Sequence, residues 1–152
     1  MDASYPDHTQ PQDLGSLFHA AFRGLRSSWA EQLAPWEITP FQWRALHTLA
    51  RVDGGLRLKD LAERLRIAPR SATEVVDQLE SAGLVDRTPD PGDRRAVIVA
   101  PTPHGTEIHD AVVSQRKERS EEYFAVLSPA EQDQLAALLT QLSGPHGEHL
   151  PR

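Results

Sequence analysis

The chain has 152 residues, of which 39% are hydrophobic and 25% charged, the size and balance of one soluble globular domain. It contains no cysteine, and Met1 is its single methionine. This excludes disulfides, cysteine-ligated zinc, thiol nucleophiles and sulfur-based redox sensing. No apolar run approaches the roughly 18 residues of a membrane span, and the polar residues 1–13 carry no export signal. We therefore expect a cytoplasmic protein with no membrane partner.

The net charge of −6 is unevenly distributed along the chain. Between Leu56 and Ala100, eight basic residues balance eight acidic ones, so the whole negative excess lies outside this segment. An acidic surface repels phosphate, whereas a locally neutral segment rich in arginine does not. The middle third is thus the part of the chain best suited to contact DNA.

The N-terminal third is predicted to consist of an arm and two helices. Residues 1–11 contain two prolines and few apolar side chains, which indicates a flexible arm. Over residues 12–34 apolar positions recur every three or four residues without an internal proline, which predicts one long amphipathic helix ending before Pro35. Thr39, Pro40 and Gln42 match a capping box that opens a second helix, expected to stop at Asp-Gly-Gly, residues 53–55.

A helix-turn-helix pattern follows this second helix. A short apolar strand is predicted at residues 56–58, and residues 59–66 are long enough for about two turns of helix. Pro69 suits the first turn of the next helix, and Gly83 suits its C-terminal stop. The buried stripe of that helix is predicted to be Ala72, Val75, Val76 and Leu79. Two helices joined by a tight turn are therefore expected.

The remaining elements are a hairpin and two helices. Residues 84–88 and 96–100 alternate or are β-branched, and the linker 89–95 contains proline and glycine, which predicts two strands joined by a seven-residue tip. A helix should begin at Pro103 and run to about Leu127, and Ser128 to Glu131 match a second capping box that opens the last helix. Residues 144–152 are predicted to form a flexible tail.

This order of elements predicts a mainly α protein with a small β-hairpin. It is the order of a winged helix-turn-helix, at about residues 39–100, between flanking helical segments at about 12–34 and 103–143. Residues 12–143 are expected to form a single domain. The apolar stripes of the flanking helices exceed what one small core can cover, so we expect them to be dimerisation helices.

Several spaced motifs resemble the MarR (multiple-antibiotic-resistance regulator) family. The motifs are Leu61-Ala-Glu-Arg-Leu65, Pro69 to Thr73, Val76-Asp-Gln-Leu-Glu80, Gly83-Leu-Val85, Arg87 and Asp93-Arg-Arg95. They cover roughly residues 42–105, and the layout of the flanking helices extends the likeness to nearly the whole chain. The resemblance implies a homodimeric regulator of transcription, a repressor that binds a palindromic operator and is released by a small ligand.

The candidate contacts to double-stranded DNA lie in the predicted second helix of the helix-turn-helix and in the hairpin. A helix that enters the major groove presents small or hydrogen-bonding side chains at its first turn, and the candidates there are Arg70, Ser71, Ala72 and Thr73. Arg94 and Arg95 are expected to enter the minor groove from the hairpin, because a narrow groove attracts guanidinium groups. The resemblance implies that Asp93 orients this wing through an ion pair. The bland alternative is that these residues belong to solvated surfaces.

Three positions depart from the pattern of the family. Glu74 is acidic beside the expected contact turn, where phosphate would repel it. The alternatives are that its carboxylate accepts from a cytosine amino group or that it lies out of reach of the DNA. Arg57 stands where a serine or threonine helix cap is common, and Arg66 stands where glycine is common in the turn. The last two changes are expected to cost local stability without breaking the fold.

Aromatic and histidine side chains gather around the junction of the first two predicted helices. The resemblance implies a pocket for a small aromatic acid near this junction, and aromatic walls with a few polar groups suit such a ligand. The candidate lining residues are Phe18, His19, Phe22, Trp29, Trp43 and His47. The same rings equally fit a hydrophobic core and a dimer interface, and both interpretations stay open at this point.

No pattern in the sequence indicates a metal, a cofactor or an enzyme. His104 and His109 are five residues apart and would lie on different faces of a helix, so no strong ligand set arises. Nucleophile elbows, phosphate loops and dinucleotide fingerprints are absent. Two hypotheses remain: a DNA-binding regulator, and a winged-helix protein-interaction module that uses its acidic surface and does not read DNA.

Overall fold

A computed structural model of the chain describes residues 13–27 and 29–144. Its contacts divide the chain into two compact units, residues 1–116 and 117–152. The predicted arm, residues 1–11, and residues 145–152 of the predicted tail lie outside the described residues. No helix among the described residues is long and apolar enough to cross a membrane.

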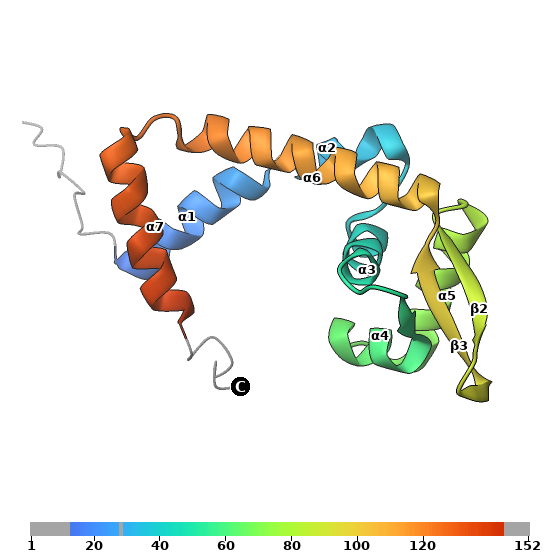
Figure 1. The fold of residues 1–152 in the computed structure, drawn as a ribbon. Coiled ribbons are helices and arrows are strands. Elements are labelled where there is room, and N and C mark those ends of the chain that lie inside the picture. The colour runs from blue at the N-terminus through green and yellow to red at the C-terminus, as the bar shows by residue number, and fades with distance from the viewer. Residues whose placement is uncertain (1–12, 28, 145–152) are drawn as a thin grey trace, which may run out of the picture. The chain divides into compact units, whose positions relative to one another are not determined.

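The described residues form helices and one small sheet (Figure 1). In chain order the elements are α1 (Leu14–Arg26), α2 (Trp29–Leu33), the 3-10 turn η1 (Ala34–Trp36), α3 (Pro40–Ala50), β1 (Leu56–Arg57), α4 (Leu58–Leu65), α5 (Pro69–Ser81), β2 (Val85–Asp90), β3 (Asp93–Pro101), α6 (Pro103–Phe124) and α7 (Pro129–Ser143). This order confirms the mainly α fold with a winged helix-turn-helix.

The prediction of a single helix over residues 12–34 is wrong. Instead of one helix over residues 12–34, the chain forms α1 and then α2, with Ser27 as the C-cap of α1. The predicted end before Pro35 is confirmed, because α2 stops at Leu33 and Pro35 lies in the 3-10 turn. Apolar spacing alone did not reveal the interruption, because the same stripe continues on both sides of it.

Helix α3 begins at the predicted capping box. The Thr39 side chain accepts a hydrogen bond from the Gln42 N–H, and the Gln42 side chain accepts one from the Thr39 N–H. An identical arrangement of Ser128 and Glu131 opens α7. Two orphan N–H groups are satisfied at each of these helix starts, so local chemistry decides where both helices begin.

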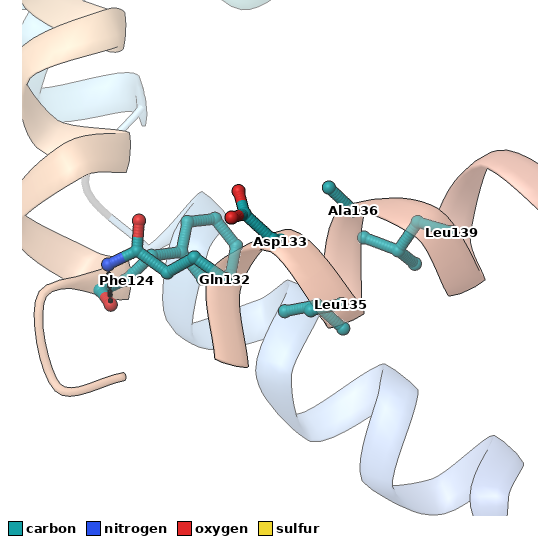
Figure 2. Close-up of a pocket in the computed structure, with 6 residues that line it drawn as sticks. All are labelled: Phe124, Gln132, Asp133, Leu135, Ala136 and Leu139. Atoms are coloured by element: carbon teal, nitrogen blue, oxygen red, sulfur yellow. Dashed lines mark hydrogen bonds between the residues drawn. The ribbon is translucent and has the colours of Figure 1, made fainter. Parts of the chain in front are cut away.

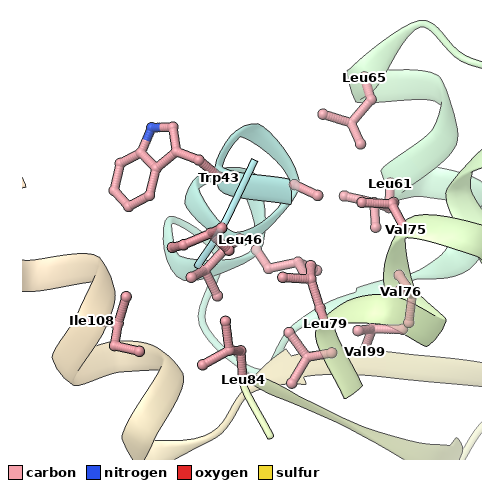
Figure 3. Close-up of a cluster of buried hydrophobic side chains, with 14 of the residues drawn as sticks. Trp43, Leu46, Leu61, Leu65, Val75, Val76, Leu79, Leu84, Val99 and Ile108 are labelled. Atoms are coloured by element: carbon pink, nitrogen blue, oxygen red, sulfur yellow. The ribbon is translucent and has the colours of Figure 1, made fainter. Parts of the chain in front are cut away.

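The core of the winged helix-turn-helix lies between α3, α4, α5 and the sheet, and α6 contributes to it (Figure 3). Leu46 and Leu49 of α3 are fully buried, and the sheet adds Val99. Ile108 and Val112 extend this core onto the first half of α6. The labelled members in Figure 3 are Trp43, Leu46, Leu61, Leu65, Val75, Val76, Leu79, Leu84, Val99 and Ile108. The packing holds the two helices of the helix-turn-helix rigidly against the wing.

The turn between α4 and α5 contains a non-glycine residue in the left-handed conformation. Arg66 has φ of 54°, and the Ile67 N–H closes the turn onto the Ala62 carbonyl at 3.1 Å. This conformation costs an L-residue about 1–2 kcal/mol. The loss of stability expected from arginine in place of glycine therefore has a structural basis here.

The wing is a three-stranded antiparallel sheet in the order β1-β3-β2. Leu56 pairs with Val99, so the short predicted strand joins the hairpin instead of standing alone. The predicted seven-residue tip is wrong, because β2 continues to Asp90 and β3 starts at Asp93, with these two residues paired. A register shift between Pro89 and Asp90 lets the strand accommodate a proline near the tip.

The flanking helices leave their apolar side chains exposed in the single chain. Neither α1 nor α7 has a buried residue. Leu14 and Phe18 of α1 are 85% and 54% exposed, and Leu138 and Leu142 of α7 are 50% and 75% exposed. Within residues 117–152, a cavity of about 300 Å³ lies beside Phe124 and the apolar side chains of α7 (Figure 2). The predicted excess of apolar surface is thus present on these helices.

Candidate nucleic-acid interface

The first turn of α5 presents polar side chains next to an uncapped helix start. Ala68 is the N-cap and makes no side-chain hydrogen bond, and Pro69 occupies the first turn. Arg70 is 90% exposed at its side chain, Thr73 is exposed and Ser71 is partly exposed. Free N–H groups at a helix start attract anions. The Thr73 hydroxyl donates to the Pro69 carbonyl at 3.1 Å, so its oxygen is left as an acceptor. The turn therefore combines backbone N–H groups with the side chains of Arg70 and Ser71 as donors on one surface.

The expectation for Ala72 requires a correction. Its side chain is 0% exposed and belongs to the buried stripe of α5, so it cannot reach a DNA base or phosphate. Ala72 serves instead to seat α5 on the core, since its small size lets the helix approach closely.

Glu74 does not present an isolated charge beside this turn. Its carboxylate pairs with the Arg70 guanidinium at 3.1 Å, one helical turn away. Both side chains are largely exposed, so the pair contributes little to stability. Its effect is electrostatic, because Arg70 offsets the charge that would otherwise repel phosphate.

Arg87 of β2 links the wing to α5. Its guanidinium pairs with Asp77 at 2.5 Å and also with Glu80. Partial burial disfavours the charged form of Arg87, but the hydrogen bonds and charges of Asp77 and Glu80 outweigh it and raise the pKa of Arg87. The resemblance to the family pointed to Arg87 as a motif residue, but this clamp between wing and helix was not predicted.

The wing arginines Arg94 and Arg95 are exposed at the start of β3. Asp93 accepts a hydrogen bond from the Arg95 N–H at 3.0 Å, so it contacts the backbone of the residue it was expected to orient. The ion pair expected at Asp93 is found at Asp90 instead, whose carboxylate lies 2.6 Å from the Arg57 guanidinium. Sequence reasoning placed Asp90 in a solvated linker and missed this pair.

Comparison with known proteins agrees with this geometry. The MarR family model matches residues 38–97. The regulator YkoM of Bacillus subtilis, an HTH-type transcriptional regulator, is 31% identical over 138 residues, 91% of this chain and 88% of YkoM. The chain belongs to the MarR family.

Two further similar proteins match most of the chain. The transcriptional repressor MdtR of Bacillus subtilis is 28% identical over 131 residues, 86% of this chain and 84% of MdtR. A mutant of MepR from S. aureus, solved bound to an oligodeoxyribonucleotide, is 25% identical with a TM-score of 0.68, covering 86% of this chain and 95% of the MepR chain. Family membership identifies the chain as a transcriptional regulator with a helix-turn-helix.

The six candidate ligand residues of this MarR-family chain fall into two groups. Phe18, His19, Phe22 and Trp29 form a series of ring contacts with centroids 6.2–6.4 Å apart. Trp43 and His47 stack at 5.4 Å on α3. Trp43 is 4% exposed and is part of the core, so for this ring the interpretation as a core residue holds.

Arg116 of α6 lies between the two groups. Its guanidinium carbon is 4.9 Å from the Trp29 ring and 4.6 Å from the Trp43 ring. Arg26 also approaches Trp29, at 5.3 Å. Burial and, second, the charge of Arg26 lower the pKa of Arg116. Its Nε is buried without a hydrogen-bond partner among the described residues, so aromatic faces take the place of polar partners at this atom.

His109 of α6 completes the α3 side of the cluster. Its ring stacks on Trp43 and His47, and its Nε2 is 3.0 Å from His47 Nδ1. The Asp110 carboxylate accepts from His109 Nδ1 at 3.0 Å. The tautomers of the two rings determine which of the two nitrogens, His47 Nδ1 or His109 Nε2, is the donor. Burial, followed by the charges of His109, Arg51 and Arg116, lowers the pKa of His47.

The histidine pair was not predicted, since His109 was considered only with His104. Within residues 13–27 and 29–144, no group of three or more histidine, cysteine, aspartate or glutamate side chains is arranged to hold a metal ion. The pair connects α3 with α6 across 62 residues of sequence. No local sequence pattern could therefore have predicted the contact between the two histidines.

Proposed function

We propose that this MarR-family regulator is a homodimeric repressor that binds a palindromic operator and is released by a small aromatic acid. Binding to chromosomal DNA would place it in the cytoplasm. The observation that carries the proposal is the joint exposure of the α5 first turn and the wing arginines, held by one core. The oligodeoxyribonucleotide bound to the MepR mutant supports DNA as the partner.

The proposed contacts divide into those that position the protein and those that read sequence. Arg94 and Arg95 would enter the minor groove, and Arg70 would contact phosphate, since guanidinium groups suit both sites. Ser71 and Thr73 would meet base edges in the major groove. The pairing of Glu74 with Arg70 and of Asp77 and Glu80 with Arg87 supports this assignment, because it reduces the negative charge that α5 presents to DNA.

The experiment measures fluorescence anisotropy of labelled duplexes selected from a random pool. Arg95→Ala should weaken operator and non-operator binding together and reduce the salt slope by roughly 1. Ser71→Ala and Thr73→Ala should change discrimination between sequences, with each good base contact contributing roughly 1–3 kcal/mol. Arg119→Ala, an exposed arginine of α6 with an ion pair to Glu122, is the matched control and should leave affinity unchanged.

The alternative function, a winged-helix protein-interaction module, predicts a different result in the same assay. Such a module would show no duplex binding even at low salt. Binding that weakens steeply with salt supports the regulator, whereas absence of binding at low salt refutes it.

A second copy of the chain is the proposed occupant of the exposed apolar faces of α1 and α7. Removal of such apolar surface from water favours association, and a two-fold axis presents two α5 helices to a palindrome. Leu138→Glu combined with Leu142→Glu should weaken the dimer in sedimentation. Ala137→Glu, which adds one like charge at an exposed site off the stripe, should weaken it much less. Truncation after Ala100 should give a monomer or an insoluble product, and a folded dimer of that fragment would contradict the proposal.

The aromatic cluster supports an aromatic carboxylate as the releasing ligand. The rings of Phe22 and Trp29 can contact an aromatic ring, and Arg116 and Arg26 provide positive charge that a carboxylate would neutralise. A ligand releases DNA only through different affinities for the two states of the protein, and tenfold weaker DNA binding requires about 1.4 kcal/mol of coupling.

The ligand test follows tryptophan fluorescence while salicylate, benzoate and related acids are added. A fluorescence change that accompanies loss of operator binding, and that Arg116→Gln abolishes, is the expected result. Neutral analogues such as benzamide are the matched control and should have no effect. If a broad panel of aromatic acids changes neither fluorescence nor DNA binding, the ligand part of the proposal is wrong.

A further inference from the structure

The tip of the wing contains a buried carboxylate that none of the proposed DNA contacts uses. Asp90, the last residue of β2, is 9% exposed. Its Oδ1 accepts from the Gly92 N–H at 2.8 Å, and its Oδ2 accepts from Arg57 Nε at 2.6 Å. Burial of a charge is costly unless the charge is paired and hydrogen-bonded. The surroundings of Asp90 meet this condition.

The protonation state of Asp90 agrees with this pairing. The Gly92 N–H, and after it Arg57, lower the pKa of Asp90 against the opposing effect of burial. The carboxylate is therefore ionised at neutral pH and pairs with a full positive charge. Ion pairs of this kind with arginine can engage two N–H groups at once, and both Nε and an Nη of Arg57 lie 2.6 Å from Asp90.

Arg57 connects three elements of the helix-turn-helix and wing. It belongs to β1, where it pairs with Ile98 of β3, and it is the N-cap residue of α4. Its side chain makes no capping hydrogen bond to α4 and extends to Asp90 instead. Serine or threonine at this position could cap α4. Arg57 does not cap the helix, and its side chain binds the wing instead.

The connection acts beside the first residues of β3, which include the wing arginines. Asp90 pairs with Asp93 directly after the register shift of β2, and Asp93 in turn accepts from the Arg95 N–H. The direction of residues 93–95 therefore depends on how the Asp90 turn is held. Without Arg57 this two-residue turn would have only its own hydrogen bonds to hold it.

We propose that Arg57 and Asp90 form a positioning pair that aims Arg94 and Arg95 at the minor groove. The inference rests on the proposed binding of DNA by this wing. Neither residue of the pair touches DNA in this mechanism. The pair contributes to the free energy of DNA binding by ordering the wing tip before DNA binds. This removes the entropy cost of ordering the tip from the association step.

The direction in which Asp90→Asn changes DNA affinity distinguishes this positioning role from a purely electrostatic effect. Asp90→Asn removes a negative charge near the DNA-facing surface, and by charge alone this should strengthen binding to phosphate. Asn still accepts a hydrogen bond from the Gly92 N–H, so the local turn is preserved while the ion pair is lost. The positioning role predicts the opposite, that Asp90→Asn weakens operator binding about tenfold, within the range seen for coupled groups.

The experiment compares duplex affinity of the full chain and its variants by anisotropy at one salt concentration. Asp86→Asn, at an exposed position of the same strand, is the matched control and should bind equally or more tightly. Arg57→Lys keeps the charge but loses the two-point contact, so it should also weaken binding. If Asp90→Asn fails to fold, as judged by circular dichroism, Arg57→Lys alone decides the question.

The decisive comparison uses the background Arg94→Ala with Arg95→Ala. If the pair acts through these arginines, Asp90→Asn and Arg57→Lys lose their effect there. Equal or tighter binding by Asp90→Asn in the wild-type background, or an undiminished loss in the Arg94→Ala, Arg95→Ala background, overturns the inference. Failure of the proposed function is distinguishable, because then Arg94→Ala with Arg95→Ala would itself leave DNA affinity unchanged.

Discussion

Gly105 of α6 is predicted to be unable to accept a side chain without a large loss of stability. A Cβ built at this position would lie 1.9 Å from the Leu84 carbonyl oxygen and 2.9 Å from its carbonyl carbon. The same oxygen accepts a hydrogen bond from the Thr102 N–H at 3.0 Å, and Leu84 is 2% exposed. Neither backbone can move without separating the start of α6 from the wing.

The cost of Gly105→Ala can be worked out from these contacts. Overpacking of a well-packed site costs about 1–3 kcal/mol, and a contact this short belongs at the upper end of that range. Loss of the Thr102 hydrogen bond increases the destabilisation by about 1 kcal/mol. The higher helix propensity of alanine reduces it by about 1 kcal/mol. We therefore expect Gly105→Ala to lower the free energy of unfolding by about 3 kcal/mol.

The assay is urea unfolding followed by tryptophan fluorescence, at one fixed protein concentration because association affects stability. Gly144→Ala is the matched control, since its nearest atom would be the Gln141 carbonyl oxygen at 3.4 Å, an ordinary contact, and it should change stability by less than about 0.5 kcal/mol. A loss below about 1 kcal/mol for Gly105→Ala, or one equal to that of the control, would refute the reasoning.

Three further predictions concern pH, the Arg87 clamp and oxidation. The pKa of His47 is lowered in the folded chain, so just below the ordinary value of 6.5 the unfolded chain binds more protons, and acidification from pH 7 should destabilise the fold. His47→Gln should reduce this loss in thermal melts at pH 7 and 5, and an unchanged pH dependence would contradict it. Arg87→Gln leaves Asp77 and Glu80 without their cation and should weaken duplex binding in anisotropy; unchanged affinity would exclude the electrostatic role of the clamp. Because the chain has no cysteine and only Met1 as methionine, mild peroxide should leave DNA affinity unchanged, and a measured loss would reveal another oxidisable group.

The sequence was most informative where structure depends on neighbouring residues. Both capping boxes, at Thr39 and Ser128, are confirmed in the structure. The glycine stop after α5 is also confirmed, with Gly83 at φ of 72°. These features involve contacts within a few residues, so residue type and spacing are sufficient to predict them.

The length of the loop at the wing tip was not predictable from neighbouring residues alone. Proline and glycine in residues 89–95 indicated a long loop, yet the strands continue to Asp90 and Asp93. The pairing is maintained by β3 lying between β1 and β2 and by the Arg57 contact with Asp90. Turn preference is a local property, whereas the length of a strand depends on the hydrogen bonds and side-chain contacts that its neighbouring strands make with it.

The sequence by itself determined the order of the elements from α3 onward, the starts of α3 and α7 and the family. Only the tertiary structure decided that Arg57 reaches Asp90 and that His47 meets His109. The reason is that each of these outcomes depends on which helix face or strand edge packs against a distant element. Periodicity specifies the face of a helix that is buried, but it does not specify which side chains from elsewhere in the chain will meet it.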